Sequence, residues 1–321
     1  MHERENALNQ WLVTLLPDKA YELNSLCSDA SFRRYFRLQY DGLSRVVMDA
    51  PPAKESLEPF IQVAQTLSQF GVPTPEILAQ DQQQGFLLLG DFGDQLLLHS
   101  LTKDNADLYY KKAITTLLKI QTCSTAGLAA FDHAFMLKEM NLCNEWFFEA
   151  YLNLNLNINE QELVQNTMQW IAAELAQQAQ VFIHRDYHSR NLMLIENNAL
   201  GVIDFQDAMR GPITYDLVSL LKDCYISWPR AKVLAWIEFF YNNNPLAQTQ
   251  SLSEFIRAFD LCGIQRHLKV LGVFGRLKLR DNKNGYIKDL PLTLKYVLDC
   301  AESYTELRPL FELIQKRVYL P

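Results

Sequence analysis

The segment Val181–Asp207, VFIHRDYHSRNLMLIENNALGVIDFQD, decides the fold because its polar residues lie between three short apolar runs. The runs VFIH, LMLIE and LGVIDF are short and β-prone, as strands of a buried sheet are. The turn ENNALG joins the second run to the third. We therefore predict a polar loop followed by a β-hairpin.

The loop and the hairpin carry a set of oxygen-bearing side chains. Asp186 and Asn191 lie on the loop, and Asp204 ends the last apolar run. A hairpin brings its far ends together, so we expect Asp204 near the loop. An amide oxygen, a carboxylate and phosphate oxygens are ligands that Mg²⁺ prefers. Asp186, ionised at neutral pH, would accept a proton from an attacking hydroxyl.

The alternative is that these polar residues only cap a hairpin, and an isolated H-x-D-x-x-x-x-N match leaves that alternative open. Three features of the surrounding chain favour phosphoryl transfer. An apolar run ends in Asp204 at a hairpin's distance, the match lies in the second of two predicted lobes, and the first lobe has the order sheet, helix, sheet.

The 321 residues are enough for two lobes, each with its own core. An amphipathic helix with Leu8, Trp11 and Leu12 on one face opens the chain and ends at Pro17. The runs RRYFRLQ, SRVVMDA, PEILAQ and GFLLLGD predict a mostly antiparallel sheet, interrupted by one helix over 57–71. Residues 1–90 are thus predicted to form a small α+β nucleotide-binding lobe.

Helical periodicity dominates the remainder, 91–321, which is predicted to be the catalytic and acceptor-binding lobe. The expected helices lie near 104–122, 136–153, 159–179, 214–227, 230–243, 251–280 and 291–316.

Composition excludes several classes of function. A net charge of −7 argues against a broad basic face for nucleic acid. The start lacks a signal sequence and no apolar run reaches membrane-spanning length, so we expect a cytoplasmic protein without a membrane partner. The six scattered cysteines suggest neither a zinc site nor a disulfide framework. No obligate protein partner is evident.

The patterns HRDYHSRN and VIDFQDAMRGPITYDLVSLL resemble the catalytic and metal-binding segments of the aminoglycoside phosphotransferase family. The resemblance implies a two-lobed protein-kinase-like fold and an ATP- and Mg²⁺-dependent kinase. It also implies that Asp186 is the catalytic base and that Asn191 and Asp204 hold Mg²⁺. His184 would brace the loop, and Asp216 would tie a helix start to it or serve only as a helix N-terminal acid.

For the nucleotide, the backbone around Leu88 to Asp91, including Gly90, is expected to pair with adenine. The phosphate loop of this fold would be CSDASFRRYFR, where Ser28, Ser31 and backbone N–H groups would bind phosphate.

This loop has no glycine, and Met48 and Asp49 stand where the resemblance predicts a strand lysine. An arginine such as Arg33 or Arg34 would replace the lysine, held by Glu55 or Glu58. Arg37 and Lys54 are the other candidates. If none replaces it, the protein would be a nucleotide-binding pseudokinase.

Within the family, SDASFRRYFR, VVMDAPP and QRHLKVLGVFGRLKLRD are most similar to bacterial kinases that phosphorylate the C1 hydroxyl of N-acetylmuramate and N-acetylglucosamine in peptidoglycan recycling. A carboxylate and an aromatic ring suit a small-molecule amino-sugar substrate. The candidate acceptor residues are Glu145, Trp146, His188, Asp207 and Arg276. Arg276 or Arg280 would bind a lactyl carboxylate. Core packing of Trp146, a solvated basic face, and an aminoglycoside, choline or homoserine acceptor are the alternatives.

Overall fold

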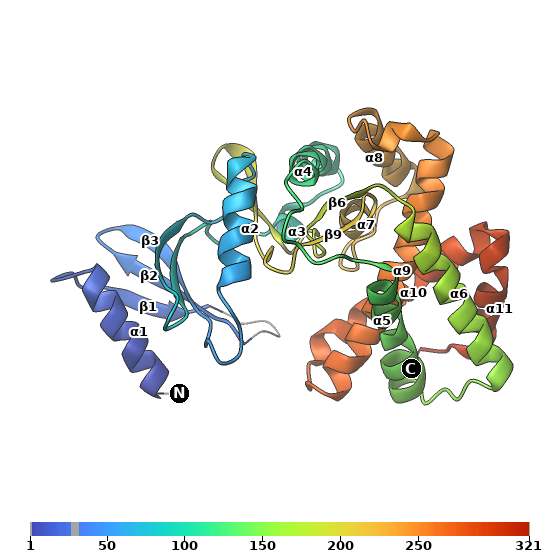
Figure 1. Cartoon of the computed structure of the whole chain (residues 1–321), viewed down its shortest axis with the longest axis horizontal. Coiled ribbons are helices and arrows are strands. Elements are labelled where there is room, and N and C mark those ends of the chain that lie inside the picture. Colours follow the sequence, from blue (N-terminus) through green and yellow to red (C-terminus); the bar gives the residue numbers. More distant parts are fainter. Residues whose placement is uncertain (1, 27–31, 321) are drawn as a thin grey trace. The chain divides into compact units, whose positions relative to one another are not determined.

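The computed structural model describes residues 2–26 and 32–320, which form two compact units. The first unit comprises residues 1–96 and 193–207, and the second comprises 97–192 and 208–321. Strands dominate the first unit and helices the second (Figure 1). The predicted domain boundary after residue 90 stays a prediction; it did not anticipate that residues 193–207 group with the first unit.

The first unit contains an antiparallel sheet of five strands in the order β1-β2-β3-β5-β4. The strands are β1 (Glu22–Ser25), β2 (Arg34–Tyr40), β3 (Leu43–Asp49), β4 (Ile77–Asp81) and β5 (Phe86–Gly90). Asp41 and Gly42 form the two-residue turn between β2 and β3, both with positive φ. The Asp-Gly pair thus selects the expected hairpin, because both turn positions require left-handed backbone.

Helix α1 (His2–Leu15) covers one face of this sheet. Its Leu8, Trp11 and Leu12 pack in one buried cluster with Leu38 of β2 and Val47 of β3. The apolar spacing seen in the sequence therefore marks the buried face of the helix.

Helix α2 (Glu58–Gln69) buries a second apolar stripe, and Figure 1 shows it on a different side of the sheet from α1. Its Phe60 ring lies 4.8 Å from the ring of Phe205, measured between centroids. Phe205 follows the predicted hairpin, whose strands are β7 (Leu192–Ile195) and β8 (Ala199–Val202). Asn197 and Asn198 take φ values of 59° and 54° in its turn, a conformation that asparagine tolerates better than most residues.

The second unit is mainly helical, with one two-stranded sheet in which β6 (Gln180–Ile183) pairs with β9 (Met209–Pro212). Its helices are α3 (Leu97–Ser100), α4 (Ala106–Gln121), α5 (His133–Leu142), the π-helix η1 (Cys143–Tyr151), α6 (Ile158–Ala176), α7 (Tyr215–Leu221), α8 (Arg230–Asn242), α9 (Leu252–Leu279), α10 (Leu290–Ser303) and α11 (Arg308–Arg317). The helix expected over 291–316 is two helices, because Pro309 starts a new one in its first turn.

Helix α9 forms the centre of the second unit and packs against α5, α7 and α10. Two of its glycines allow a close approach to neighbouring backbone. A Cβ at Gly272 would lie 2.2 Å from the carbonyl carbon of Leu142, and one at Gly275 would lie 2.5 Å from the carbonyl oxygen of Trp146. The glycines thus seat the π-helix η1, which replaces the second half of the helix expected over 136–153.

Among the described helices, none is long and apolar enough to cross a membrane. Five cysteines fall within the described part of the chain, and all five are buried free thiols. Burial raises the pKa of the Cys224 thiol to about 11, so this thiol stays protonated at neutral pH.

Candidate active site

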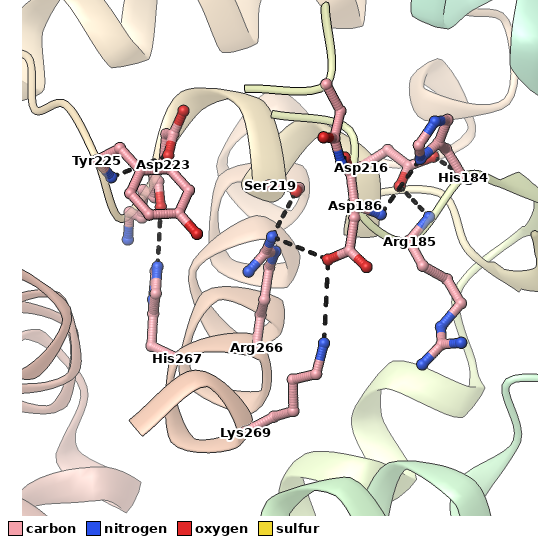
Figure 2. A network of polar contacts seen from close by, with 12 residues as sticks. His184, Arg185, Asp186, Asp216, Ser219, Asp223, Tyr225, Arg266, His267 and Lys269 are labelled. Carbon is pink, nitrogen blue, oxygen red and sulfur yellow. Dashed lines mark hydrogen bonds and ion pairs between the residues drawn. The ribbon is translucent and has the colours of Figure 1, made fainter. Parts of the chain in front are cut away.

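The polar loop of the opening segment begins where β6 ends and is anchored there by Asp216 of α7. The Asp216 carboxylate accepts hydrogen bonds from the backbone N–H groups of His184, at 2.6 Å, and Arg185, at 2.9 Å (Figure 2). Arg185 has a φ of 77°, a left-handed conformation that costs free energy and needs such support. Burial raises the pKa of Asp216 to about 6, although His184 and the two N–H groups act in the opposite direction.

The other end of the loop is anchored by Asp223, just after α7. The backbone N–H of Ser189 donates to Asp223 Oδ2 at 3.0 Å, and the Ser189 hydroxyl donates to the same oxygen. The Tyr187 hydroxyl donates to the carbonyl of Ala113 in the core. Two buried carboxylates therefore hold the loop, and only Asp216 was proposed from the sequence.

Asp186 lies between these anchors with 38% of its side chain exposed. Arg266 Nη2 lies 3.6 Å and Lys269 Nζ 4.0 Å from its Oδ1, and Figure 2 shows both cations reaching it from α9. Burial alone would raise the pKa of Asp186, but Lys269 and Arg266 outweigh it and hold that pKa well below the ordinary value. Asp186 is therefore a carboxylate at any physiological pH.

The prediction from sequence missed both cations, although they belong to the quoted run QRHLK. Arg266 and its neighbours Gln265 and His267 are buried polar residues within the apolar helix α9. Charged residues are rarely buried without a partner. An arginine at an otherwise apolar, buried position of a predicted helix thus indicates a buried ion pair. The sequence does not show which carboxylate is its partner.

Asn191 closes the loop by donating from Nδ2 to the backbone carbonyl of Asp186 at 3.0 Å. Because the nitrogen is oriented in this way, the amide oxygen is the atom that would ligate a cation. His184 is fully buried, and its Nδ1 accepts from the Asp186 N–H at 3.3 Å. His184 therefore contacts the loop that it was predicted to brace, and its role stays a prediction.

Asp204 is an exposed residue of the first unit, two positions after the end of β8, with a φ of 62°. Its Oδ1 accepts a hydrogen bond of 2.8 Å from Gln206 Nε2. Among the described residues, no group of three or more His, Cys, Asp or Glu side chains gathers to hold a metal. Asp204 in the first unit and Asn191 in the second each offer an oxygen of the kind that Mg²⁺ prefers, and their joint binding of one ion stays a prediction.

The arginines of the FRRYFR run have different partners in the first unit. Arg33 Nε lies 2.8 Å from Glu55 Oε2, and both side chains are mostly buried. Tyr35 lies in the same electrostatic neighbourhood: burial raises its pKa to about 12, Arg33 acts to lower it, and Asp204 and Glu55 act to raise it. The Arg33–Glu55 pair, Tyr35 and Asp204 therefore belong to one region of this unit.

Arg34 and Arg37 are committed elsewhere. Arg34 donates from Nε to the fully buried Asp49 at 3.1 Å, and Arg4 of α1 binds the same carboxylate. Arg37 donates to Asp91 at 2.7 Å and to Asp94 at 2.8 Å. Each of the three arginines thus has an acidic partner, and which of them binds phosphate stays a prediction.

The other predicted nucleotide contacts stay predictions, and the structure shows what their backbone groups already bind. Leu88 lies in mid-strand, paired with Val47 of β3 on one side and Ala79 of β4 on the other. The Gly90 N–H donates to the carbonyl of Glu76. An adenine edge would therefore have to meet backbone beyond Gly90, because the strand interior is already paired. Ser28 and Ser31 lie outside the described residues.

Four of the five predicted acceptor residues belong to the second unit. Glu145 is exposed and Trp146 half-buried on η1, next to the α9 glycines. Arg276 follows Gly275, and its buried Nε makes no hydrogen bond to any described residue.

His188 packs edge-to-face on Tyr225 at 5.5 Å between ring centroids. Burial lowers the pKa of His188, against the effects of Asp223 and Asp186. The fifth residue, Asp207, is exposed in the first unit, so its part in an acceptor pocket stays a prediction.

Comparison with solved structures confirms the predicted kinase-like fold. The choline kinase LicA from Streptococcus pneumoniae matches with a TM-score of 0.66 at 13% identity, covering 94% of this chain and 100% of that chain. An ADP-bound aminoglycoside phosphotransferase, APH(2'')-Ib, matches with a TM-score of 0.61 at 15% identity, covering 90% and 97%.

Sequence comparison identifies the family. N-acetylmuramate/N-acetylglucosamine kinase from Pseudomonas aeruginosa is 41% identical, over 97% of this chain and 96% of that protein. The protein of the same name from Neisseria meningitidis is 38% identical, over 98% and 96%. The model of the phosphotransferase enzyme family matches residues 22–248. The chain, with its anchored Asp186 loop, belongs to the phosphotransferase enzyme family.

Proposed function

We propose that this protein transfers the γ-phosphoryl group of ATP to the anomeric C1 hydroxyl of N-acetylmuramate, N-acetylglucosamine or both. The observation that carries the proposal is the 41% identity, over 97% of the chain, to a kinase named for these two sugars. The anchored loop around Asp186 supplies the catalytic carboxylate that such a reaction requires. The product would enter the recycling of cell-wall sugars, in the cytoplasm as predicted from the sequence.

In this proposal Asp186 binds the acceptor hydroxyl and receives its proton. The carboxylate is partly exposed and can therefore be reached by substrate, while its backbone is fixed by the contacts of His184 and Asn191. Its low pKa makes it a weak base. A weak base suffices because phosphoryl transfer has a loose transition state, in which positioning and charge stabilisation matter most.

The nucleotide phosphates would be held by Arg33 and by Mg²⁺. Glu55 fixes the Arg33 guanidinium, as an acidic partner fixes the phosphate-binding lysine in protein kinases. Asn191 and Asp204 would supply the protein oxygens to Mg²⁺, which neutralises phosphate charge when bound.

The sugar would lie beside η1 and the carboxy-terminal half of α9. Trp146 offers a flat apolar surface to a sugar ring, and Glu145 offers acceptors to its hydroxyls. Arg276 would bind the lactyl carboxylate that N-acetylmuramate has and N-acetylglucosamine lacks. Replacement of Arg276 by glutamine should then raise KM for N-acetylmuramate more than for N-acetylglucosamine.

The experiment is a coupled kinase assay with ATP, Mg²⁺ and each of N-acetylmuramate, N-acetylglucosamine, an aminoglycoside and choline. Phosphorus NMR of the product distinguishes phosphorylation at C1 from phosphorylation at C6. We expect a C1 phosphate from at least one of the sugars. Turnover of choline or the aminoglycoside alone would contradict the proposal, and nucleotide binding without any turnover would indicate a pseudokinase.

The proposal that Arg33 is the phosphate-binding cation is tested by comparing Arg33→Ala with Arg37→Ala. The second variant removes an arginine from the same region of the chain, one that is bound to Asp91 and Asp94. Loss of one charged contact to phosphate costs about 1.5–3 kcal/mol, so Arg33→Ala should weaken ATP binding by roughly 10- to 100-fold. Calorimetric titration with ATP measures the effect. Equal affinity in both variants would show that another group binds the phosphates.

A further inference from the structure

Two cations of α9 face the carboxylate of Asp186. Arg266 and Lys269 both lie within ion-pair distance of its Oδ1, at 3.6 and 4.0 Å. The nearby cation Arg185 is paired with Glu139, and the nearby carboxylate Asp223 is engaged by Ser189. The hydrogen bonds from Ser189 leave the negative charge of Asp223 in place, and this charge acts on Arg266. Among the described residues, Asp186 is the one carboxylate within ion-pair distance of Lys269, so an anionic group beside Lys269 would be stabilised.

The two cations differ in how fully their donors are used. Arg266 is buried, with 5% of its side chain exposed, and its Nη2 donates to Ser219 Oγ at 2.7 Å. Lys269 has 14% exposed, and its Nζ donates no hydrogen bond to any residue that the structure describes. An ammonium group has three donors. Arg266 thus holds Asp186 in place, while Lys269 keeps donors for a ligand.

We propose that Lys269 is a further catalytic residue, which contacts the phosphoryl group as it passes to the acceptor oxygen. The inference rests on the proposed phosphoryl transfer. An acceptor hydroxyl bound to Asp186 would lie about 2.6–3.2 Å from the carboxylate. Lys269 Nζ, 4.0 Å from Oδ1, then lies within about 7 Å of that hydroxyl before any movement of its flexible side chain.

The reaction step balances with this assignment. A bond forms between the acceptor oxygen and the γ-phosphorus, and the bond from the γ-phosphorus to the β,γ-bridging oxygen breaks with its electrons going to ADP. The hydroxyl proton passes to Asp186 and then to solvent. Lys269 transfers no proton and donates hydrogen bonds to the equatorial oxygens of the moving group, where the charge is spread.

A rival role for Lys269 is recognition of the lactyl carboxylate of N-acetylmuramate. Geometry favours the phosphoryl role, because Asp186 marks the reacting hydroxyl and not a substituent elsewhere on the ring. The two roles predict different results with two acceptors. A phosphoryl contact affects both sugars equally, whereas a carboxylate contact affects only N-acetylmuramate.

The test compares Lys269→Met, Lys269→Gln and Lys269→Arg with the control Lys278→Met. Lys278 lies on the same helix, about 13 Å further along at 1.5 Å per residue, and donates to Asn284. For each variant, kcat and KM are measured with N-acetylmuramate and with N-acetylglucosamine. Slow ATP hydrolysis without sugar, ADP affinity by calorimetry and the unfolding midpoint are measured as well.

We expect Lys269→Met and Lys269→Gln to lower kcat about 100-fold, the typical effect of losing one donor to a transition state. The loss should be similar with both sugars and in ATP hydrolysis, with ADP affinity within twofold of wild type. Lys269→Arg should recover part of the rate, and Lys278→Met should match wild type.

Three results would overturn the assignment: a kcat within threefold of wild type, a loss confined to KM for N-acetylmuramate, or an equal loss of ADP affinity. If the wild type phosphorylates neither sugar, the proposed acceptor fails, and ATP hydrolysis still decides the role of Lys269. If the Met or Gln variant does not fold, the comparison of Lys269→Arg with wild type on the two sugars decides it, because a displaced charge slows both acceptors equally only in the phosphoryl role.

Discussion

Two carboxylates of this protein, Asp49 and Asp186, each lie beside two cations but differ in their exposure and in the hydrogen bonds of those cations. Asp49 is fully buried between Arg4 and Arg34, and Arg34 also reaches Glu5 at 3.3 Å. Asp186 has 38% of its side chain exposed, and of its two cations Lys269 makes no hydrogen bond within the described residues. The Asp49 carboxylate is thus shielded from solvent, whereas the Asp186 carboxylate is partly exposed.

The difference shows that the number of cations around a carboxylate does not identify a reactive group. A fully buried carboxylate between two cations is out of reach of substrate, whereas a partly exposed carboxylate can contact it. Asp49 is instructive because it stands where the family resemblance predicts a strand lysine. Its charge stabilises the contact between α1 and the sheet, so the phosphate cation must come from another position.

The largest effect is expected for Asp186→Asn. The amide cannot accept the hydroxyl proton, so kcat should fall by about 10²- to 10⁴-fold. ADP affinity should be unchanged, because in the proposed reaction Asp186 would bind the acceptor and not the nucleotide. Steady-state kinetics and calorimetry measure the two quantities. A variant that keeps more than a tenth of wild-type kcat would remove Asp186 from the reaction.

Asp49→Asn should act on stability instead. It leaves Arg4 and Arg34 without their shared anion, and breaking such a buried pair costs about 3–4 kcal/mol of unfolding free energy. Urea denaturation measures the cost, with Asp41→Asn as the control because Asp41 forms an exposed pair with Lys19 worth at most about 1 kcal/mol. If Asp49→Asn kept wild-type stability but lost turnover, Asp49 would have a functional and not a structural role, which would contradict its contrast with Asp186.

Asp216 adds a third carboxylate to the comparison of Asp49 with Asp186. It is buried like Asp49, but its carboxylate accepts hydrogen bonds from backbone N–H groups. Its pKa is raised to about 6, whereas in the unfolded chain it is about 3.9. At a pH between these two pKa values, Asp216 is ionised in the unfolded chain but still protonated in the folded protein. The free energy of unfolding therefore falls as pH rises from about 4 to 6, by at most about 3 kcal/mol. The change is complete above the folded-state pKa.

Asp216→Asn should remove this component of the pH dependence. Denaturant unfolding of wild type and variant at pH 4, 5, 6 and 7 measures the free energy of unfolding. Plotted against pH, this free energy should have a less negative slope between pH 4 and 6 in the variant. Identical slopes would mean that Asp216 is ionised throughout and that its N–H bonds outweigh burial.

Local patterns were enough to predict much of the fold. The Asp41-Gly42 turn, the apolar face of α1 and the β7–β8 hairpin all follow from residues close in sequence. Each depends on spacing or on the conformational preference of one or two residues, and these are visible in the chain itself. The fold class and the loop around Asp186 could be predicted for this reason.

Other features could not be predicted because they depend on neighbours. The sequence predicts that Leu88 is a strand residue near a turn. In the structure its strand is paired on both sides, so few backbone N–H and C=O groups remain to bind adenine. The π-helix over Cys143–Tyr151 has an ordinary helical pattern, and only the close packing of Gly272 and Gly275 reveals why its backbone differs.

The sequence by itself determined which residues are proposed for the chemistry: a carboxylate on a loop, an asparagine five residues later and a second carboxylate after a hairpin. Those residues are set by short-range spacing. Only the tertiary structure decided which cations meet which carboxylates. Arg266 and Lys269 lie about eighty residues from Asp186 in the chain, and a charge in a sequence does not show its partner. Ion pairs form between side chains that folding brings together, so their assignment required the packing of α9.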